Sequence, residues 1–168
     1  MRLVAIDVET YDPNLKTLGD GSCRDSDSPD DDGSCLLCVG TYDGQRAKAY
    51  YPFTEEWNEF LEMMSDENTD KVYHNGIYDL AWLYCGYDVE IKGLQHDTMT
   101  RMTYIDEYAD LDLDSCCRYF RLPGKNKAQT IEAWYEQHKV DVMNAAAILG
   151  RKIKKTDDLW KHSKFLWD

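Results

Sequence analysis

Two acidic residues near the N-terminus, Asp7 and Glu9, are the side chains of this sequence best placed to do chemistry. They stand one residue apart at the end of an apolar run that begins at Leu3, which predicts a β-strand over residues 3–9. Successive strand side chains alternate between faces, so both carboxylates are expected on one face, which would otherwise belong to the core. Paired like charges there are costly unless a cation neutralises them, so the pattern favours a hard divalent metal. An edge strand with two solvated acids is the alternative interpretation.

A third acid, Asp79, follows a second predicted strand at residues 71–74. Asn75 is a good N-cap for a helix that begins near Gly76, because apolar residues recur at helical spacing after it. Asp79 then lies in or near the first turn, where the helix dipole tolerates a carboxylate. Taken singly, each residue also has an ordinary structural explanation, Asn75 as a cap and Asp79 as a stabilising first-turn acid.

Together these residues resemble the motifs of the DEDD superfamily of 3′–5′ exonucleases, in the form that precedes the polymerase domain of family A DNA polymerases. The first motif of that family, Asp-x-Glu on the first strand, is matched by Asp7 and Glu9. The second, Asn-x-x-x-Asp with an aromatic residue before the Asp, is matched by Asn75, Tyr78 and Asp79. Three further stretches are similar to phage-type members: residues 12–19, 95–99 and 111–115. The resemblance covers nearly the whole chain.

This resemblance implies hydrolysis of the last phosphodiester of a DNA strand with the help of two Mg²⁺ or Mn²⁺ ions. Asp7, the most central acid, would bridge the two ions. Glu9 would hold the first ion and orient the attacking water, and Asp79 would complete the shell of the second. These three residues are the expected catalytic and metal-binding side chains.

The substrate implied by the resemblance is the 3′ end of single-stranded DNA. The backbone near Thr10 and the side chain of Asn75 would hold the terminal nucleotide, and Tyr78 would pack against it. The resemblance also implies a polymerase domain as partner, either in the same chain or in a separate one.

The family has a fourth acid, in a Tyr-x-x-x-Asp or His-x-x-x-x-Asp pattern on a late helix, which this sequence does not clearly supply. Asp88 and Asp112 fit the first pattern, but both come too soon after Asp79, and Asp112 is expected to cap a helix. Asp168 has Lys164 where that pattern needs Tyr. We therefore predict that the sequence stops just short of the last motif.

Two classes of function stay open. One is a metal-dependent DNA 3′–5′ exonuclease of the proofreading type, impaired if the fourth acid is lacking. The other is a catalytically inactive domain on the same fold that braces a polymerase or binds DNA ends. The three acids favour the enzyme, and the missing fourth acid favours weak or no activity for these residues alone. An RNA exonuclease is a lesser alternative, because nothing reads a 2′-hydroxyl.

Length and charge fit this interpretation. At 168 residues the chain is expected to form a single domain, residues 1–168. The net charge of −13 argues against a simple DNA-coating protein but not against a nuclease, whose metals meet the phosphate. Lys125 and Lys127 form the nearest thing to a basic loop, either a solvated turn or a phosphate contact. Without a signal peptide or an apolar membrane span, the expected location is the cytoplasm, with reduced cysteines.

Hydrophobic patterning predicts an α/β fold with a mixed central sheet flanked by helices, which agrees with the three-layer ribonuclease H-like fold that the resemblance implies. Expected strands are residues 3–9, 35–42, 48–53, 71–74 and 94–97. Expected helices are residues 55–64, 98–105, 112–120, 131–138 and 143–149, besides the one from Gly76. Residues 25–33 read as an acidic surface insertion that lacks the pattern of a calcium loop.

Cys35 and Cys38, with Cys23 nearby, have the spacing of zinc ligands. They lie in an apolar strand, however, and no matching second pair exists in the sequence. Buried free thiols are therefore the preferred interpretation.

Overall fold

The computed structural model describes residues 2–12, 14–22 and 33–124, and the chain divides into two compact units, residues 1–121 and 122–168. The strands and helices named below all belong to the first unit. The predicted helices at 131–138 and 143–149, the acidic insertion apart from Gly33, and Lys125, Lys127 and Asp168 lie outside the described residues.

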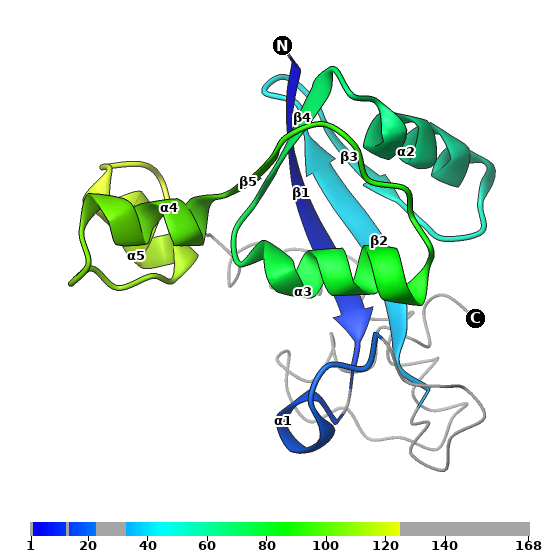
Figure 1. The fold of residues 1–168 in the computed structure, drawn as a ribbon, viewed down its shortest axis with the longest axis horizontal. Coiled ribbons are helices and arrows are strands. Elements are labelled where there is room, and N and C mark those ends of the chain that lie inside the picture. The colour runs from blue at the N-terminus through cyan, green and yellow to red at the C-terminus, as the bar shows by residue number, and fades with distance from the viewer. Residues whose placement is uncertain (1, 13, 23–32, 125–168) are drawn as a thin grey trace, which may run out of the picture. The chain divides into compact units, whose positions relative to one another are not determined.

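A mixed sheet with the strand order β3-β2-β1-β4-β5 forms the centre of this unit (Figure 1). β1, β2 and β3 pair antiparallel, whereas β4 joins β1 in parallel and β5 joins β4 in parallel. The strands are β1 (Arg2–Tyr11), β2 (Cys35–Tyr42), β3 (Ala47–Tyr50), β4 (Thr69–Tyr73) and β5 (Gln95–Asp97). The strand that carries the first acidic motif is thus the middle strand of the sheet.

β1 shows the expected alternation of faces. Val4, Ile6 and Val8 are buried, whereas Asp7 and Glu9 are exposed on the opposite face. The prediction that the two acids share a face agrees with this pattern, but the prediction that their face would belong to the core is wrong. The even-numbered apolar residues turn toward the core, and exposure removes the desolvation cost expected for paired carboxylates.

Two helical segments supply the core against the Val4 face. α2 (Glu55–Ser65) buries Trp57 and Phe60 there, and α3 (Gly76–Ala81) continues into a π-helical turn, η1 (Trp82–Gly86), that buries Trp82 and Leu83. A wide π turn is an irregularity often found near functional sites. These segments form one helical layer on the same face of the sheet.

Three further helices are described: α1 (Leu15–Leu18), α4 (Thr98–Ile105) and α5 (Leu113–Tyr119). The bounds of α4 are those predicted from the sequence. The capping role predicted for Asp112 is also observed, because its carboxylate accepts the N–H of Ser115 at 3.0 Å. β5 leads directly into α4 (Figure 1).

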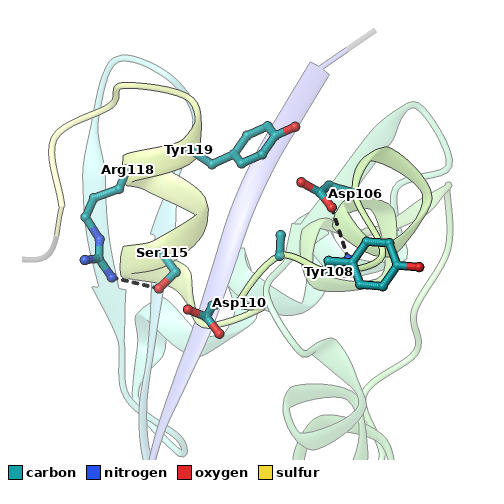
Figure 2. A pocket seen from close by; sticks show the side chains of 7 residues that line it. Asp106, Tyr108, Asp110, Ser115, Arg118 and Tyr119 are labelled. Carbon is teal, nitrogen blue, oxygen red and sulfur yellow. Dashed lines mark hydrogen bonds between the residues drawn. The ribbon is translucent and has the colours of Figure 1, made fainter.

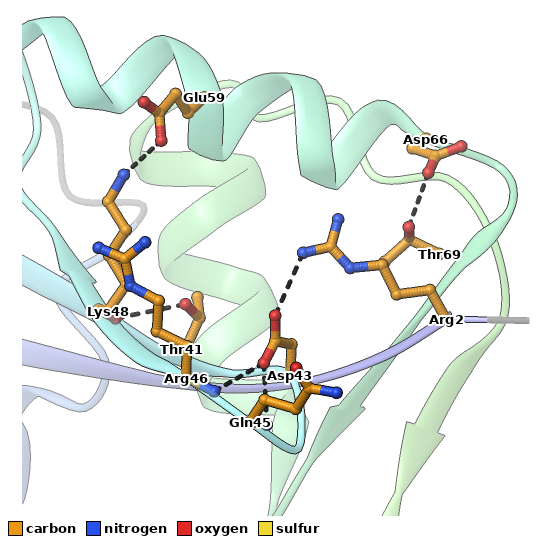
Figure 3. Close-up of polar contacts among 9 residues, drawn as sticks. All are labelled: Arg2, Thr41, Asp43, Gln45, Arg46, Lys48, Glu59, Asp66 and Thr69. Atoms are coloured by element: carbon orange, nitrogen blue, oxygen red, sulfur yellow. Dashed lines mark hydrogen bonds and ion pairs between the residues drawn. The ribbon is translucent and has the colours of Figure 1, made fainter.

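The hairpin between β2 and β3 is closed by Asp43, whose carboxylate accepts the backbone N–H groups of Gln45 at 3.0 Å and Arg46 at 2.8 Å (Figure 3). These bonds lower the pKa of Asp43. Lys48 on β3 forms an ion pair with Glu59 of α2, so the hairpin and the helix that follows it are tied at the surface.

Lys71 is a fully buried cation in β4. Its Nζ donates to the backbone oxygens of Asp66 at 2.8 Å and Lys92 at 2.6 Å, which joins the loops before β4 and before β5. Burial lowers its pKa. In the part of the chain that the structure describes, no helix has the length and apolarity needed to cross a membrane.

Candidate active site

The second motif reaches the first because β4 ends early. Pairing between β1 and β4 runs from Arg2 with Thr69 to Ala5 with Val72, after which the chain turns into α3. The side chain of Asp79 stands where a longer β4 would continue, and its Oδ1 accepts the N–H of Val8 at 2.9 Å. This bond attaches Asp79 to β1 at the residue between Asp7 and Glu9.

The environment of Asp79 disfavours its charge. The residue is only 5% exposed. Burial and the nearby Asp7 raise its pKa to about 6, although the hydrogen bond from the Val8 amide acts in the opposite direction. Cys38, which pairs with Glu9 across β1 and β2, also has a raised pKa, first through burial and then through Glu9 and Asp7. The end of β1 is therefore a region of negative potential in which a cation would be favoured.

Within the described residues, no group of three or more His, Cys, Asp or Glu side chains forms a cluster that could hold a metal ion. Asp79 is buried and bonded to a backbone amide, whereas Asp7 and Glu9 are on the exposed face. Their convergence on metal thus stays a prediction. Cys35 and Cys38, which have the spacing of zinc ligands, are likewise in no such cluster among the described residues, and both are free thiols.

Thr10 and Tyr78, expected to contact substrate, contact each other. Their hydroxyl oxygens lie 2.6 Å apart, which joins the end of β1 to α3. The register of β1 with β2 shifts between Glu9 and Thr10, so a β-bulge separates the two acids from Thr10.

Asn75 precedes α3 as expected, but the predicted capping role is wrong. Its backbone is left-handed (φ 66°), and its side chain makes no capping hydrogen bond. Asp97 at the end of β5 instead accepts the N–H of Gly76 at 2.7 Å. The sequence marked Asp97 as the residue before a helix, but nothing in the sequence indicated that it also reaches α3.

Asp12, just past β1, is another residue whose role the sequence did not show. Its carboxylate accepts the N–H of Gly21 at 2.9 Å and the hydroxyl of Ser34 at 3.3 Å. These contacts fix the segment after the first motif to the residues that lead into β2.

The described residues also form an open hollow, and Figure 2 shows the side chains that line it. Its lining comes from the segment after α4 and from α5: Asp106, Tyr108, Ala109, Asp110, Ser115, Arg118 and Tyr119. None of the six candidate residues lines it. The acids of β1 lie on an exposed sheet face, so the candidate site does not coincide with this hollow.

The mixed sheet with a central acidic strand defines a ribonuclease H-like α/β fold, the class to which solved nucleases similar to this chain belong. A comparison with protein-family models matches residues 2–148 to the family described as 3′–5′ exonuclease. The chain therefore belongs to the 3′–5′ exonuclease family, as the sequence motifs indicated. No functionally curated protein matches it in sequence.

Among solved structures, one described as the apo form of the nuclease superposes with a TM-score of 0.57 at 19% identity, covering 76% of this chain and 55% of that one. The chain thus spans about half the length of that nuclease. Brucella melitensis NrnC with bound Mg²⁺ gives a TM-score of 0.50 at 17% identity, covering 95% of this chain and 80% of that one. At these identities the likeness is one of fold.

Proposed function

We propose that this chain is a metal-dependent 3′–5′ exonuclease that removes 3′-terminal nucleotides from DNA. The observation that carries the proposal is the bond between Val8 and Asp79, which attaches the acid of the second motif to β1 between Asp7 and Glu9. This bond brings together the strand of the first motif and the side chain of the second across 71 positions of the sequence.

The donor chemistry of these residues fits Mg²⁺ or Mn²⁺. Asp7, Glu9 and Asp79 offer hard carboxylate oxygens, the ligands that these ions prefer, and burial, with the nearby Asp7, raises the pKa of Asp79. When bound, two ions would supply positive charge to the phosphate and lower the pKa of the attacking water.

Each acid has a separate task in the proposed reaction. Asp7, the most central, would hold both ions, and Glu9 would hold the first and orient the water. Asp79 would serve the second ion, partly through water, because its Oδ1 is engaged with the backbone of Val8.

The substrate in this proposal is the 3′ end of single-stranded DNA. The backbone near Thr10 and the side chain of Asn75 would hold the last nucleotide, and Tyr78 would pack against it. The hydrogen bond between Tyr78 and Thr10 keeps these two residues adjacent. Proofreading with a polymerase domain, in the same chain or a separate one, is the setting that we propose.

A second candidate is a catalytically inactive exonuclease-fold domain that braces a polymerase or binds DNA ends. It is favoured by one observation, that the described residues contain no ready-made cluster of three metal ligands. The two candidates differ in a single measurable property, hydrolysis.

The experiment incubates the 168-residue chain with a 5′-labelled single-stranded oligonucleotide and Mn²⁺ or Mg²⁺. The exonuclease proposal expects stepwise shortening from the 3′ end, release of mononucleotides, and complete loss with EDTA. Asp7→Ala should abolish the reaction, whereas Asp110→Asn, an exposed acid beside the hollow, should leave it unchanged. DNA-end binding without any shortening would favour the inactive domain.

A further inference from the structure

Asp97 holds the first turns of two helices at once. Its Oδ1 accepts the N–H groups of Met99 at 2.8 Å and Thr100 at 3.0 Å, an ordinary N-cap of α4. Its Oδ2 accepts the N–H of Gly76 at 2.7 Å, and the N–H of Asn75 donates to Oδ1 at 3.4 Å. A single carboxylate therefore serves amides at the start of both α3 and α4.

The start of α3 depends on this contact. Asn75 makes no capping bond with its own side chain, and α3 is a helix of 6 residues, too short to be stable alone. Gly76 packs tightly on the end of β4, because a Cβ there would lie 2.7 Å from the Cβ of Tyr73. The missing side chain lets α3 begin directly against the strand, within reach of Asp97.

The residue after Asp97 strengthens the same junction. Thr98 donates its hydroxyl to the backbone oxygen of Tyr73 at 2.9 Å, and the hydroxyl oxygen of Thr98 also lies 2.9 Å from Nδ1 of His74. Nε2 of His74 is 2.9 Å from the backbone oxygen of Leu111. The turn between β4 and α3 is thus held from the junction of β5 and α4.

We infer that Asp97 is a positioning residue for the second motif: its carboxylate fixes where α3 begins, and with it where Asn75 and Asp79 lie against β1. The inference rests on the proposed function for its catalytic meaning. Four backbone N–H bonds hold the pKa of Asp97 below its ordinary value although burial opposes this, so the group stays an acceptor at neutral pH. Its loss would release the helix that presents Asp79.

The test compares Asp97→Ala with Asp112→Ala, because Asp112 caps α5 through Ser115 but has no contact with α3 among the bonds described. The readout is hydrogen exchange of the Val8 amide, measured by NMR, because that amide donates to Asp79. We expect Asp97→Ala to speed its exchange about tenfold relative to the wild type, and Asp112→Ala to leave it unchanged.

Two further measurements complete the test. The concentration of Mn²⁺ that half-saturates nuclease activity should rise in Asp97→Ala and not in Asp112→Ala, at temperatures where both are folded. If Asp97→Ala does not fold, Asp97→Asn and Asp112→Asn replace the pair, because Asn keeps the side-chain volume and can accept from one helix only.

The outcomes separate the two proposals. Equal Val8 exchange in the two variants would show that Asp97 is an ordinary helix cap, and would overturn the inference. Faster Val8 exchange in Asp97→Ala, in a protein that has no nuclease activity, would support the positioning role and count against the proposed function alone.

Discussion

The acids of β1 and the acid of α3 are neighbours, yet the fold treats them differently. Asp7 and Glu9 lie on an exposed sheet face, where a carboxylate costs little. Asp79 is buried, bonded to Val8, and its pKa is raised to about 6. The comparison teaches that one acidic site can contain exposed acids whose own charge costs little beside a buried acid that opposes folding when it is charged.

The largest effect expected from this comparison is on activity. Asp7→Asn and Asp79→Asn should each lower the rate of mononucleotide release by about 10²–10³-fold, the loss typical of one transition-state contact. Single-turnover rates with labelled DNA at saturating Mn²⁺ would measure this. Full activity in Asp79→Asn would break the comparison, because the buried acid would then be structural only.

The second prediction concerns stability and pH in the metal-free protein. An acid whose pKa rises on folding binds protons more tightly in the folded state, so its penalty is absent at about pH 4 and develops as pH rises toward 6. Asp79→Asn should therefore raise the free energy of unfolding at pH 7.5 by about 1–3 kcal/mol and change it little at pH 4. Urea unfolding at both pH values tests this, and Asp7→Asn should give a smaller change of the same sign, because Asp7 is only one cause of the raised pKa of Asp79.

The third prediction is a stabilisation by metal. Mn²⁺ at tenfold excess over its dissociation constant should raise the free energy of unfolding by about 1.4 kcal/mol, because binding favours the folded state. Thermal unfolding with and without EDTA would show it. The shift should disappear in both Asp7→Asn and Asp79→Asn, and an unchanged shift in either variant would place the metal elsewhere.

The smallest expected effect concerns the link between the two regions. Tyr78→Phe removes the hydroxyl that bonds Thr10 and should cost about 1 kcal/mol of stability. Tyr84→Phe, at a residue that is 65% exposed, is the matched control and should change stability by less than about 0.5 kcal/mol. Equal values for the two would mean that the Tyr78 bond adds nothing in solution.

Local features were predictable from the sequence because they depend on near neighbours. The alternation of β1, the helix at residues 98–105 and the cap at Asp112 follow from periodicity and from capping chemistry. Which face of β1 meets the core was predicted wrongly, since that choice is made by α2 and η1, elements distant in sequence.

Contacts made through the tertiary fold were not predictable in the same way. Asn75 was predicted to cap α3 because its residue type suits that role. In the structure, the carboxylate of Asp97 at the end of β5 accepts the N–H of Gly76 instead. The acids of the candidate site were identified because their motifs resemble a family, and no local pattern revealed the bond from Val8 to Asp79.

That bond also has a consequence for how the protein is made. It joins residues 71 positions apart, and the pairing of β1 with β4 joins residues that are similarly far apart in the sequence. Contacts of such range form late and slowly, because a long loop must close first. During synthesis, Asp7 and Glu9 leave the ribosome well before Asp79 can join them. We therefore expect that a nascent or partly folded chain cannot hydrolyse DNA. Under the proposed function, the appearance of nuclease activity would then report that the sheet has formed.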